Sequence, residues 1–537
     1  MPYDARRCAT RLDYPRTRVS IGATPEGTML QERLSALSRD TLRGMRRGIE
    51  KESLRTQPDG ALARTAHAAA LGSALSHPSI TTDFSESQLE LITGVHASPE
   101  ACIEEVTRIH QYVYRHIGDE LLWAASMPCG LPEENRIPIG RYGTSNIGRA
   151  KTVYRNGLSW RYGRRMQTIS GVHYNWSLPG VGNDGYFALI RNFRRCSWLL
   201  LYLFGASPAV CKSFVAGRAH DLEALADDTL YRPWATSLRM GRLGYQSEAQ
   251  ALLCVSYNSL ESYGGSLQGA LTQPYPPYEQ VGIREPGAKG DAPESYRQLS
   301  TTLLQIENEF YGTIRPKRRI RQGERPLHAL RERGVEYVEV RLMDLDPFEP
   351  IGIHARTMRF LDLFLLHCLL AESPPDTPEE VRALARNQQL AATRGREPGL
   401  QLERDGSKAP LPDLAGEVLA ECAPIAARLD EVFGGSHYGE ALAAAHAVLR
   451  NPASAPSARM LAEMAHGFGN SYTAFVLERS RRHRQALTTV PLPRAEGERF
   501  ARLAAASIAE QKAIEAADTL PFEEYRRNYL AVEQLGV

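Results

Sequence analysis

The sequence predicts an α+β fold, in which a mostly antiparallel sheet is surrounded by many helices. Two patterns predict it. Up to about residue 350, short segments alternate between apolar and polar residues, as strands with one buried face do. Beyond Pro350, alanine-rich runs carry apolar residues at helical spacing, with Gly, Pro, Asn and Ser between the runs. No repeat of fixed period is visible, so we expect one sheet with a helical layer around it.

The predicted elements follow one another along the chain. Alternation predicts strand-like segments at residues 48–54, 81–93, 172–178 and 335–342. Apolar residues at helical spacing predict helices at residues 31–43, 187–202, 292–310, 414–433, 438–449, 458–482 and 497–517. Turn-forming residues mark the clearest loops, at residues 286–293 and 393–412.

We expect one large domain with an extension before it. Residues 1–30 contain arginines and turn-forming residues but no hydrophobic signal core, which predicts a loosely structured N-terminal extension. Residues 31–537 form the domain itself. Within it, residues 31–350 are predicted to be the sheet-bearing part that holds the site, and residues 351–537 the mainly helical covering part.

The composition excludes several classes of protein. With 43% hydrophobic and 23% charged residues, the chain is typical of a folded globular protein rather than a disordered one. Its formal net charge of +2 is too small to steer it onto nucleic acid or an anionic membrane. The longest apolar runs, at residues 197–204 and 360–371, are shorter than the roughly 20 residues of a membrane span. We therefore expect no nucleic-acid or membrane partner.

The eight cysteines are scattered singly, with no CxxC pair and no cluster at zinc spacing. This pattern predicts no disulfide scaffold and favours a reducing compartment. We therefore expect a cytoplasmic protein. We also expect it to act as a monomer, or at most as a weak homo-oligomer.

Several predicted strands carry polar side chains on a single face. Successive side chains of a strand point to opposite faces, so residues two apart share a face. The shared faces carry Glu50 with Glu52, His173 with Asn175, and Glu339 with Arg341. In the fourth segment, Glu90 lies between two leucines, and Asp83 lies in the turn that precedes it.

If these four segments pair in one sheet, their carboxylates and an imidazole gather on one surface. Like charges a few ångströms apart repel unless a cation lies between them, and Mg²⁺ prefers oxygen ligands and usually arrives with phosphate. Basic residues stand nearby, at Lys151, at Arg155 and in the run IRPKRR at residues 314–319. The pattern therefore favours ATP chemistry. The alternative for each segment alone is a solvated strand face, and for the basic run a solvated loop.

Two glycine-rich segments approach known nucleotide-binding motifs but do not meet their requirements. In GTSNIGRA, at residues 143–150, Arg149 and Ala150 replace the Lys and the Ser or Thr of a P-loop. GVGNDG, at residues 180–185, matches GxGxxG but follows Pro179 and has no acidic residue about 20 positions downstream. Neither segment predicts a P-loop or a Rossmann site.

Taken in order, the polar segments resemble the glutamate-cysteine ligases (γ-glutamylcysteine synthetases) of the proteobacterial type. The landmarks include RGIEKESLR, RYGTSNIGRAKTVYRNGL, RYGRRMQTISGVHYNWSLP, LLQIENEFYGTIRPKR and GVEYVEVRLMDLDPFEPIG, and they span the chain from about residue 31. The resemblance implies a glutamine-synthetase-like fold, with a curved antiparallel sheet that forms a funnel around metal ions. It makes residues 31–537 a catalytic domain.

The same resemblance implies a reaction. ATP would phosphorylate the γ-carboxylate of L-glutamate, and the amine of L-cysteine would attack this γ-glutamyl phosphate. The products would be γ-glutamylcysteine, ADP and phosphate, in the first step of glutathione biosynthesis. Mg²⁺ is the implied metal, with Mn²⁺ as an alternative, and ATP is a co-substrate.

The resemblance also implies roles for individual residues. It implies metal ligands at Glu50, Glu52, Asp83, Glu90, His173 and Glu339. It implies catalytic arginines at Arg155 and Arg341, which would contact the ATP phosphates together with Lys317. It implies substrate contacts at Phe84, Tyr154, Leu158, Gln167, Asn175, Arg239, Tyr245 and Tyr311, with Arg239 suited to the cysteine carboxylate.

Two other functions stay open at this point. One is another glutamate-amine ligase of the same fold, which would use a different amine. The other is a noncatalytic binding protein, in which the acidic strands are only a solvated face. The chain also departs from the family pattern, because residues before 31 have no counterpart and RLMDLDPFEP differs from the usual sequence after Arg341.

Overall fold

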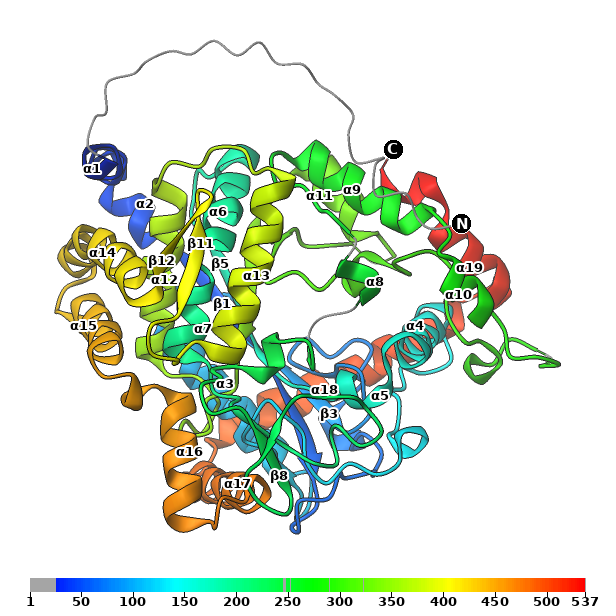
Figure 1. The fold of residues 1–537 in the computed structure, drawn as a ribbon. Coiled ribbons are helices and arrows are strands. Elements are labelled where there is room, and N and C mark those ends of the chain that lie inside the picture. Colours follow the sequence, from blue (N-terminus) through cyan, green and yellow to red (C-terminus); the bar gives the residue numbers. More distant parts are fainter. Residues whose placement is uncertain (1–25, 245–247, 252, 289, 322, 537) are drawn as a thin grey trace.

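The computed structural model describes residues 26–244, 248–251, 253–288, 290–321 and 323–536 (Figure 1). At its centre is a seven-stranded sheet with the strand order β2-β3-β1-β5-β10-β9, and β4 pairs with β1 outside this path. Every pair in the sheet is antiparallel. The strands are β1 (Arg46–Thr56), β2 (Ile80–Thr82), β3 (Gln88–Ile92), β4 (Leu121–Leu122), β5 (Val172–Ser177), β9 (Ile314–Lys317) and β10 (Tyr337–Met343). The predicted α+β class is confirmed.

The four polar segments of the sequence do pair in this sheet. The residue opposite Glu50 on β5 is His173, and the residue opposite Glu52 on β3 is Glu90. Further along, Glu339 on β10 lies opposite Asn175 on β5. Because opposed residues on paired strands point to the same face, this register brings the polar side chains of neighbouring strands together.

The other face of the sheet is the core of the molecule. Ile49, Tyr174, Trp176, Val338 and Val340 are all buried there. Helices α3 (Pro99–Tyr114), α7 (Trp198–Phe204) and α6 (Asn183–Cys196) pack against the strands, and α12 (Ala355–Leu370) packs on α3 and α6. The sheet is therefore apolar and helix-covered on one side and polar on the other.

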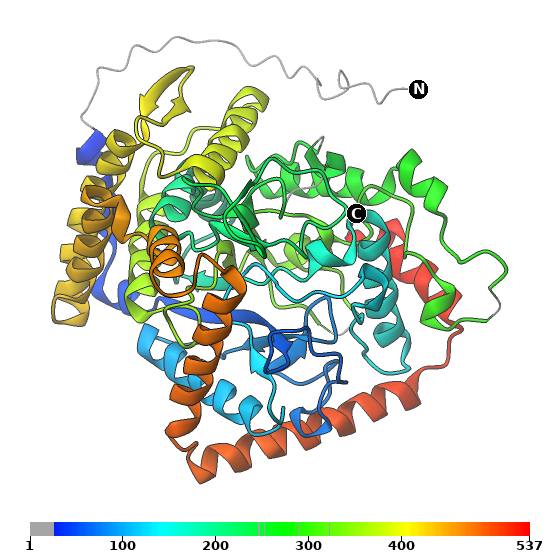
Figure 2. The same cartoon turned by 60° about the horizontal axis from the view of Figure 1, so that its bottom comes forward.

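Further helices enclose the sheet. Those that precede β10 in the sequence are α1 (Glu26–Ala36), α2 (Arg39–Arg43), α4 (Asn146–Tyr162), α5 (Arg164–Gln167), α8 (Glu248–Ala251), α9 (Leu260–Thr272), α10 (Pro276–Val281) and α11 (Pro326–Arg333). Those that follow β10 are α13 (Pro378–Arg394), α14 (Leu411–Phe433), α15 (His437–Arg450), α16 (Pro456–Gly467), α17 (Tyr472–Thr489), α18 (Arg494–Ala517) and α19 (Phe522–Leu530). In Figure 2 the long orange-red helix α18 runs along the lower edge and leads to the red α19. There α19 packs against α4, so the end of the chain returns to the sheet-bearing part.

Two small sheets complete the structure. One contains β6 (Ala209–Cys211), β7 (Glu223–Ala224) and β8 (Thr229–Tyr231), and the other is the hairpin β11 (Gln401–Arg404) with β12 (Ser407–Pro410). The hairpin lies in a segment predicted to be a loop. Its turn residues Asp405 and Gly406 both have positive φ, as a tight two-residue hairpin turn requires, so the Asp-Gly pair was the missed signal.

Four predicted helices differ from the structure. The segment 292–310 contains only short 3-10 turns, because Gln298, Gln305, Glu307 and Glu309 are buried rather than on the exposed face of a helix. Ser197 separates α6 from α7 within the predicted helix 187–202, and the predicted helix 458–482 is broken between α16 and α17. The opening helix is also two helices, because Ser38 caps α2 by accepting a hydrogen bond from the Thr41 amide.

One disulfide joins Cys129 to Cys211, whose Cα atoms lie 5.3 Å apart. The scattered cysteines predicted no disulfide scaffold and contained no local signal for this single bond. The two cysteines are 82 residues apart in the sequence, and only the fold brings them together. Cys102, Cys368 and Cys422 are buried thiols. Within the described part of the chain, no helix combines the length and the apolar character needed to cross a bilayer.

Candidate active site

The polar face of the sheet lines a cavity of about 350 Å³. Its walls come from the sheet, from helix α4, from the segment before β9 and from the C-terminal helix α19. The cavity lining contains these predicted site residues: Glu50, Asp83, Phe84, Glu90, Tyr154, Arg155, Leu158, Gln167, His173, Tyr311, Lys317, Glu339 and Arg341. Side chains from sequence positions far apart therefore face one space.

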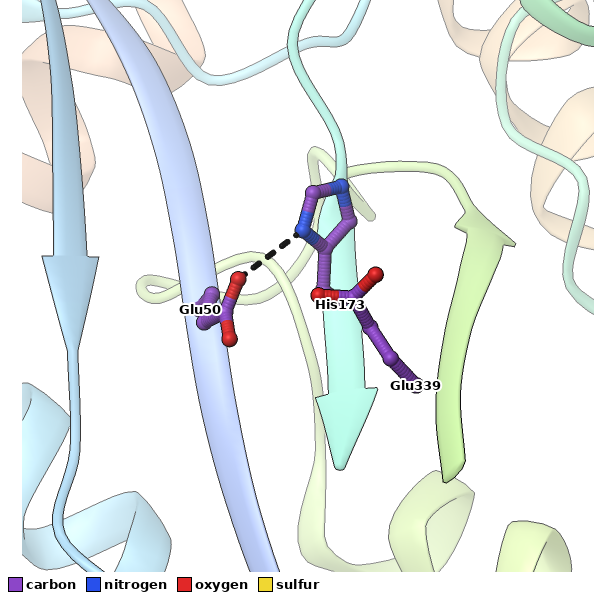
Figure 3. A group of neighbouring side chains, drawn as sticks. All are labelled: Glu50, His173 and Glu339. Atoms are coloured by element: carbon purple, nitrogen blue, oxygen red, sulfur yellow. Dashed lines mark hydrogen bonds and ion pairs between the residues drawn. The ribbon is translucent and has the colours of Figure 1, made fainter. Parts of the chain in front are cut away.

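Two acidic clusters lie on this face and share His173. In the first, the Glu339 cluster, ligand atoms of Glu50, His173 and Glu339 lie within 4.8 Å of one another. Figure 3 shows these three side chains on three neighbouring strands, with His173 Nδ1 3.1 Å from Glu50 Oε2. In the second, the Glu52 cluster, ligand atoms of Glu52, Glu90 and His173 also lie within 4.8 Å of one another.

The two ring nitrogens of the shared His173 face different clusters: Nδ1 lies near Glu50, and Nε2 lies near Glu52. Its Nε2 lies 3.5 Å from Glu52 Oε1 and is a buried atom with no hydrogen-bond partner among the described residues. A buried polar atom without a partner is costly, and an imidazole nitrogen beside carboxylates suits a bound cation. The donor set of oxygens with one nitrogen fits Mg²⁺ or Mn²⁺.

Neighbouring cations neutralise the Glu339 cluster. Lys317 Nζ donates to Glu339 Oε1 at 3.0 Å, and Arg341 Nη1 donates to Glu339 Oε2 at 2.9 Å. Burial raises the pKa of Glu339, but Lys317 and Arg341 outweigh burial and hold this pKa well below its usual value. Burial and the charge of Glu339 likewise raise the pKa of Glu50, but the hydrogen bond from His173 and the charge of Lys317 leave it lowered.

The Glu52 cluster has the opposite surroundings. Among the described residues, no lysine or arginine forms an ion pair with Glu52 or Glu90. Burial and the charge of Asp83 raise the pKa of Glu52 to about 8, although two arginines oppose the shift. Burial and the nearby carboxylates raise the pKa of Glu90 well above its usual value. These carboxyl groups are thus crowded acids, and no lysine or arginine in the described part of the chain is paired with either of them.

Two cations on helix α4 face the cavity from the side. Arg155 and Lys151 both lie over the ring of the buried Tyr142, at 4.4 and 5.2 Å from the ring centroid. The Arg155 Nε atom also donates to the carbonyl oxygen of Asp83. Burial and the charge of Arg155 lower the pKa of Lys151 to about 8. Tyr142 was not among the predicted site residues, because only these contacts show that its ring supports two cavity-lining cations.

One end of the cavity is built around Tyr311. Its hydroxyl accepts a hydrogen bond from Gln167 Nε2 at 2.7 Å, and its ring packs edge-on against Tyr162 with centroids 5.5 Å apart. Tyr154 and Leu158 of α4 line the same cavity. This end offers apolar and aromatic walls with a few hydrogen-bonding groups, as a site for a small side chain needs.

The opposite end is apolar and includes residues that the sequence analysis did not single out. Its walls are Ile147 and Ala150 of α4, Leu299, and Tyr525 and Tyr529 of α19. The repeated spacing of three or four residues along α4, from Ile147 to Leu158, was a signal in the sequence that one helix face lines the cavity. The tyrosines could not be found that way, because α19 lies far along the chain.

Three other predicted site residues do not line the cavity, and a fourth is not among the residues that the structure describes. Glu52 is buried behind the lining, where its Oε2 accepts from the Gly171 amide at 2.8 Å. Asn175 donates to Glu50 Oε1 at 2.9 Å. Arg239 is fully buried and donates through Nη2 to the carbonyl oxygen of Arg341 at 2.9 Å, so the structure does not bring its guanidinium to the cavity. Tyr245 lies outside the described residues.

Comparisons with known proteins agree along most of the chain. A family model described as glutamate-cysteine ligase matches residues 31–391. A glutamate-cysteine ligase of Alcanivorax borkumensis is 48% identical over 522 residues, which cover 93% of this chain and 99% of that protein. One of Azotobacter vinelandii is 48% identical over 511 residues, which cover 91% and 95%.

Solved structures agree with the fold. The crystal structure of the glutamate-cysteine ligase of Francisella tularensis in complex with AMP matches with a TM-score of 0.85 and 36% identity, covering 91% of this chain and 97% of that chain. A bifunctional glutathione synthetase of Pasteurella multocida matches with a TM-score of 0.65 over 86% of this chain and 55% of that one. At 24% identity, the second match shows the fold alone.

Proposed function

This chain belongs to the glutamate-cysteine ligase family, and from that premise we propose that its two acidic clusters hold the metal ions and orient the ATP phosphates for ligation. The chain is an ATP-dependent ligase that makes γ-glutamylcysteine, the first step of glutathione biosynthesis. The observation that carries the proposal is the convergence of Glu50, His173 and Glu339 from three strands into one cavity that also contains Arg341.

The metal ligands proposed are the two clusters with Asp83 beside them. Glu50, His173 and Glu339 would hold one ion, and Glu52, Glu90 and the Nε2 atom of His173 would hold another. Mg²⁺, or Mn²⁺ in its place, would supply positive charge beside the transferring phosphoryl group. The crowding of Glu52 and Glu90 supports this assignment, because their mutual repulsion is relieved by a cation.

Helix α4 orders the substrates along the cavity. The stretch from Ile147 to Leu158 is about 16 Å long at 1.5 Å per residue. The apolar end at Ile147, Tyr525 and Tyr529 suits a purine base, and Lys151 and Arg155 in the middle suit phosphate oxygens. The end at Leu158 and Tyr311 suits the cysteine side chain. The relative from Francisella tularensis was solved with AMP, which supports a nucleotide site in this fold.

The chemistry needs positioning more than a protein nucleophile. Arg341, fixed by its hydrogen bond to Glu339, and Arg155, fixed by the Asp83 carbonyl and the Tyr142 ring, present charge to the oxygens of the phosphoryl group. A γ-carboxylate oxygen of glutamate would attack the γ-phosphorus of ATP, the bond from that phosphorus to ADP would break, and γ-glutamyl phosphate would form. The cysteine amine then attacks the acyl carbon, the C–O bond to phosphate breaks, and the amine loses a proton.

The proposal extends to the setting of the enzyme. Its partners are small molecules that include ATP. We infer a cytoplasmic enzyme, because ATP is its co-substrate, and a monomer or at most a weak homo-oligomer. Light scattering of the purified chain would measure the oligomeric state.

Phosphate release tests this proposed function directly. We expect release with ATP, Mg²⁺, glutamate and cysteine, a far slower rate when glycine or ammonia replaces cysteine, and none in EDTA. Turnover with ammonia at the cysteine rate would show that the acceptor assignment is wrong. Unchanged turnover in EDTA would refute the proposed metal sites. As a matched control, Glu336→Gln alters a glutamate whose side chain is 45% exposed next to β10, and it should keep the parent rate.

A further inference from the structure

Gln250 lies at the centre of a buried hydrogen-bond network behind Tyr311. Its Oε1 atom accepts from the Tyr311 backbone amide at 2.9 Å. Its Nε2 atom donates to the Glu309 carbonyl oxygen at 2.8 Å and to the Tyr162 hydroxyl at 3.1 Å. The Gln250 side chain is buried, and so is its bond to the Glu309 carbonyl oxygen, so loss of the carboxamide would leave that carbonyl without a replacement from bulk water.

The network behind this residue is anchored to helix α4. The Glu309 Oε1 atom accepts from Arg161 Nη1 at 2.8 Å and from the Tyr162 hydroxyl at 2.7 Å, and the side chains of Arg161 and Glu309 are fully buried. The Tyr162 hydroxyl therefore donates to Glu309 while it accepts from Gln250. The wall that carries Tyr311 is thus fixed to the helix that carries Tyr154 and Leu158.

A carboxamide satisfies all three described partners of Gln250. The Tyr311 amide needs an acceptor, whereas the Glu309 carbonyl needs a donor, and a glutamine side chain offers both at one terminus. A glutamate could not donate to the carbonyl, and an apolar residue would leave both backbone groups without partners. The backbone groups of Tyr311 and Glu309 therefore require a side chain at position 250 that both donates and accepts a hydrogen bond.

We propose that Gln250 is a positioning residue for the amine acceptor: it fixes the main chain at Tyr311 and so sets the fit of the cysteine side chain. This inference rests on the acceptor pocket of the proposed function. Gln250 is absent from the cavity lining, so its influence passes through Tyr311 rather than through contact with a substrate. Loss of Gln250 should loosen one wall of the pocket and leave the nucleotide and metal end in place.

The test compares cysteine with hydroxylamine, a small amine that has no side chain to fit. We expect Gln250→Ala to raise the KM for cysteine about tenfold, equivalent to ~1.4 kcal/mol. The KM values for ATP and glutamate, and the rate of hydroxamate formation from hydroxylamine, should stay within about twofold of the parent. Gln250→Met keeps the side-chain volume, removes the three described side-chain hydrogen bonds, and carries the test if the alanine variant does not fold.

Gln111→Ala is the matched control. Gln111 is also buried, and it donates to the Val490 carbonyl oxygen at 2.9 Å, outside the cavity lining. It should leave the KM for cysteine unchanged. An unchanged KM for cysteine in the Gln250 variants would overturn the inference. So would an equal fall in the cysteine and hydroxylamine rates, because that is the result of a general loss of structure.

A third variant separates this inference from the proposed function. Tyr311→Ala removes the pocket wall itself. If Tyr311→Ala leaves the KM for cysteine unchanged, the acceptor pocket is wrongly placed and the proposed function fails at that point. If Tyr311→Ala raises this KM and Gln250→Met does not, the pocket stands and only the role of Gln250 is refuted.

Discussion

The two acidic clusters that share His173 are made of the same residue types but differ in what surrounds them. In the Glu339 cluster, Lys317 and Arg341 donate directly to the glutamate, and its pKa is lowered. In the Glu52 cluster, burial and nearby carboxylates act on the acids, and their pKa values are raised. The protein's own cations therefore favour the ionised form of Glu339, whereas burial and like charges favour the protonated forms of Glu52 and Glu90, and a bound cation would favour their ionised forms.

This difference allows the effect of a mutation on metal binding to be separated from its effect on protein stability. Removing the Glu339 carboxylate deprives Lys317 and Arg341 of their common partner. Removing a carboxyl group from the Glu52 cluster takes away an acid whose ionised form is disfavoured by burial and by the nearby carboxylates. Both changes would remove a proposed metal ligand, so activity and stability should respond differently in the two clusters.

The largest expected effect is on activity and is common to both clusters. Glu339→Gln and Glu90→Gln should each reduce the rate of Mg²⁺-dependent phosphate release about a hundredfold or more, because an amide is a weaker ligand than a carboxylate. Initial rates at saturating ATP, glutamate and cysteine measure this. If one variant keeps a rate within a few-fold of the parent, its cluster does not hold a catalytic ion.

A smaller effect concerns stability in EDTA, and here the two variants should differ in sign. Glu339→Gln leaves Lys317 and Arg341 without their carboxylate and should lower the free energy of unfolding by roughly 2 kcal/mol. Glu90→Gln removes one of several crowded acids and should raise it by roughly 1 kcal/mol. Thermal unfolding midpoints of the two variants and the parent show the direction. Shifts of the same sign would mean that the clusters do not differ as described.

The smallest effect is a pH dependence of the metal-free protein. The folded-state pKa of Glu52 is raised to about 8, so the protonated acid is favoured by folding. Its contribution to stability is fully present below the unfolded pKa near 4.5 and is lost as the pH rises toward 8. In EDTA, the unfolding midpoint should therefore fall by roughly 2 °C between pH 5 and pH 8.

Saturating Mg²⁺ and the Glu52→Gln variant are the two controls for this pH dependence. Mg²⁺ should flatten it, because the ion stabilises the ionised carboxylates. Glu52→Gln in EDTA should also show a flatter profile than the parent. A midpoint in EDTA that rises with pH over this range would contradict the assigned pKa direction.

The sequence determined the faces of the strands but not the neighbours of each strand. Alternation alone placed Glu50 with Glu52 and Glu339 with Arg341, because the geometry of an extended chain fixes side-chain direction locally. The family landmarks supplied the reaction and the order of the segments. The pairing of β1 with β3 and β5, which brings Glu52 to Glu90 and Glu50 to His173, is a property of the folded sheet.

Only the tertiary structure decided the rest. The segment 292–310 has the composition of a helix, yet its buried Glu309 is held by Arg161 of α4, and such long-range partners override local propensity. Gln250 and Tyr525 carry no local pattern that marks them. The opposite surroundings of Glu52 and Glu339 also follow from the fold, because a pKa depends on burial and on which charges lie nearby in space.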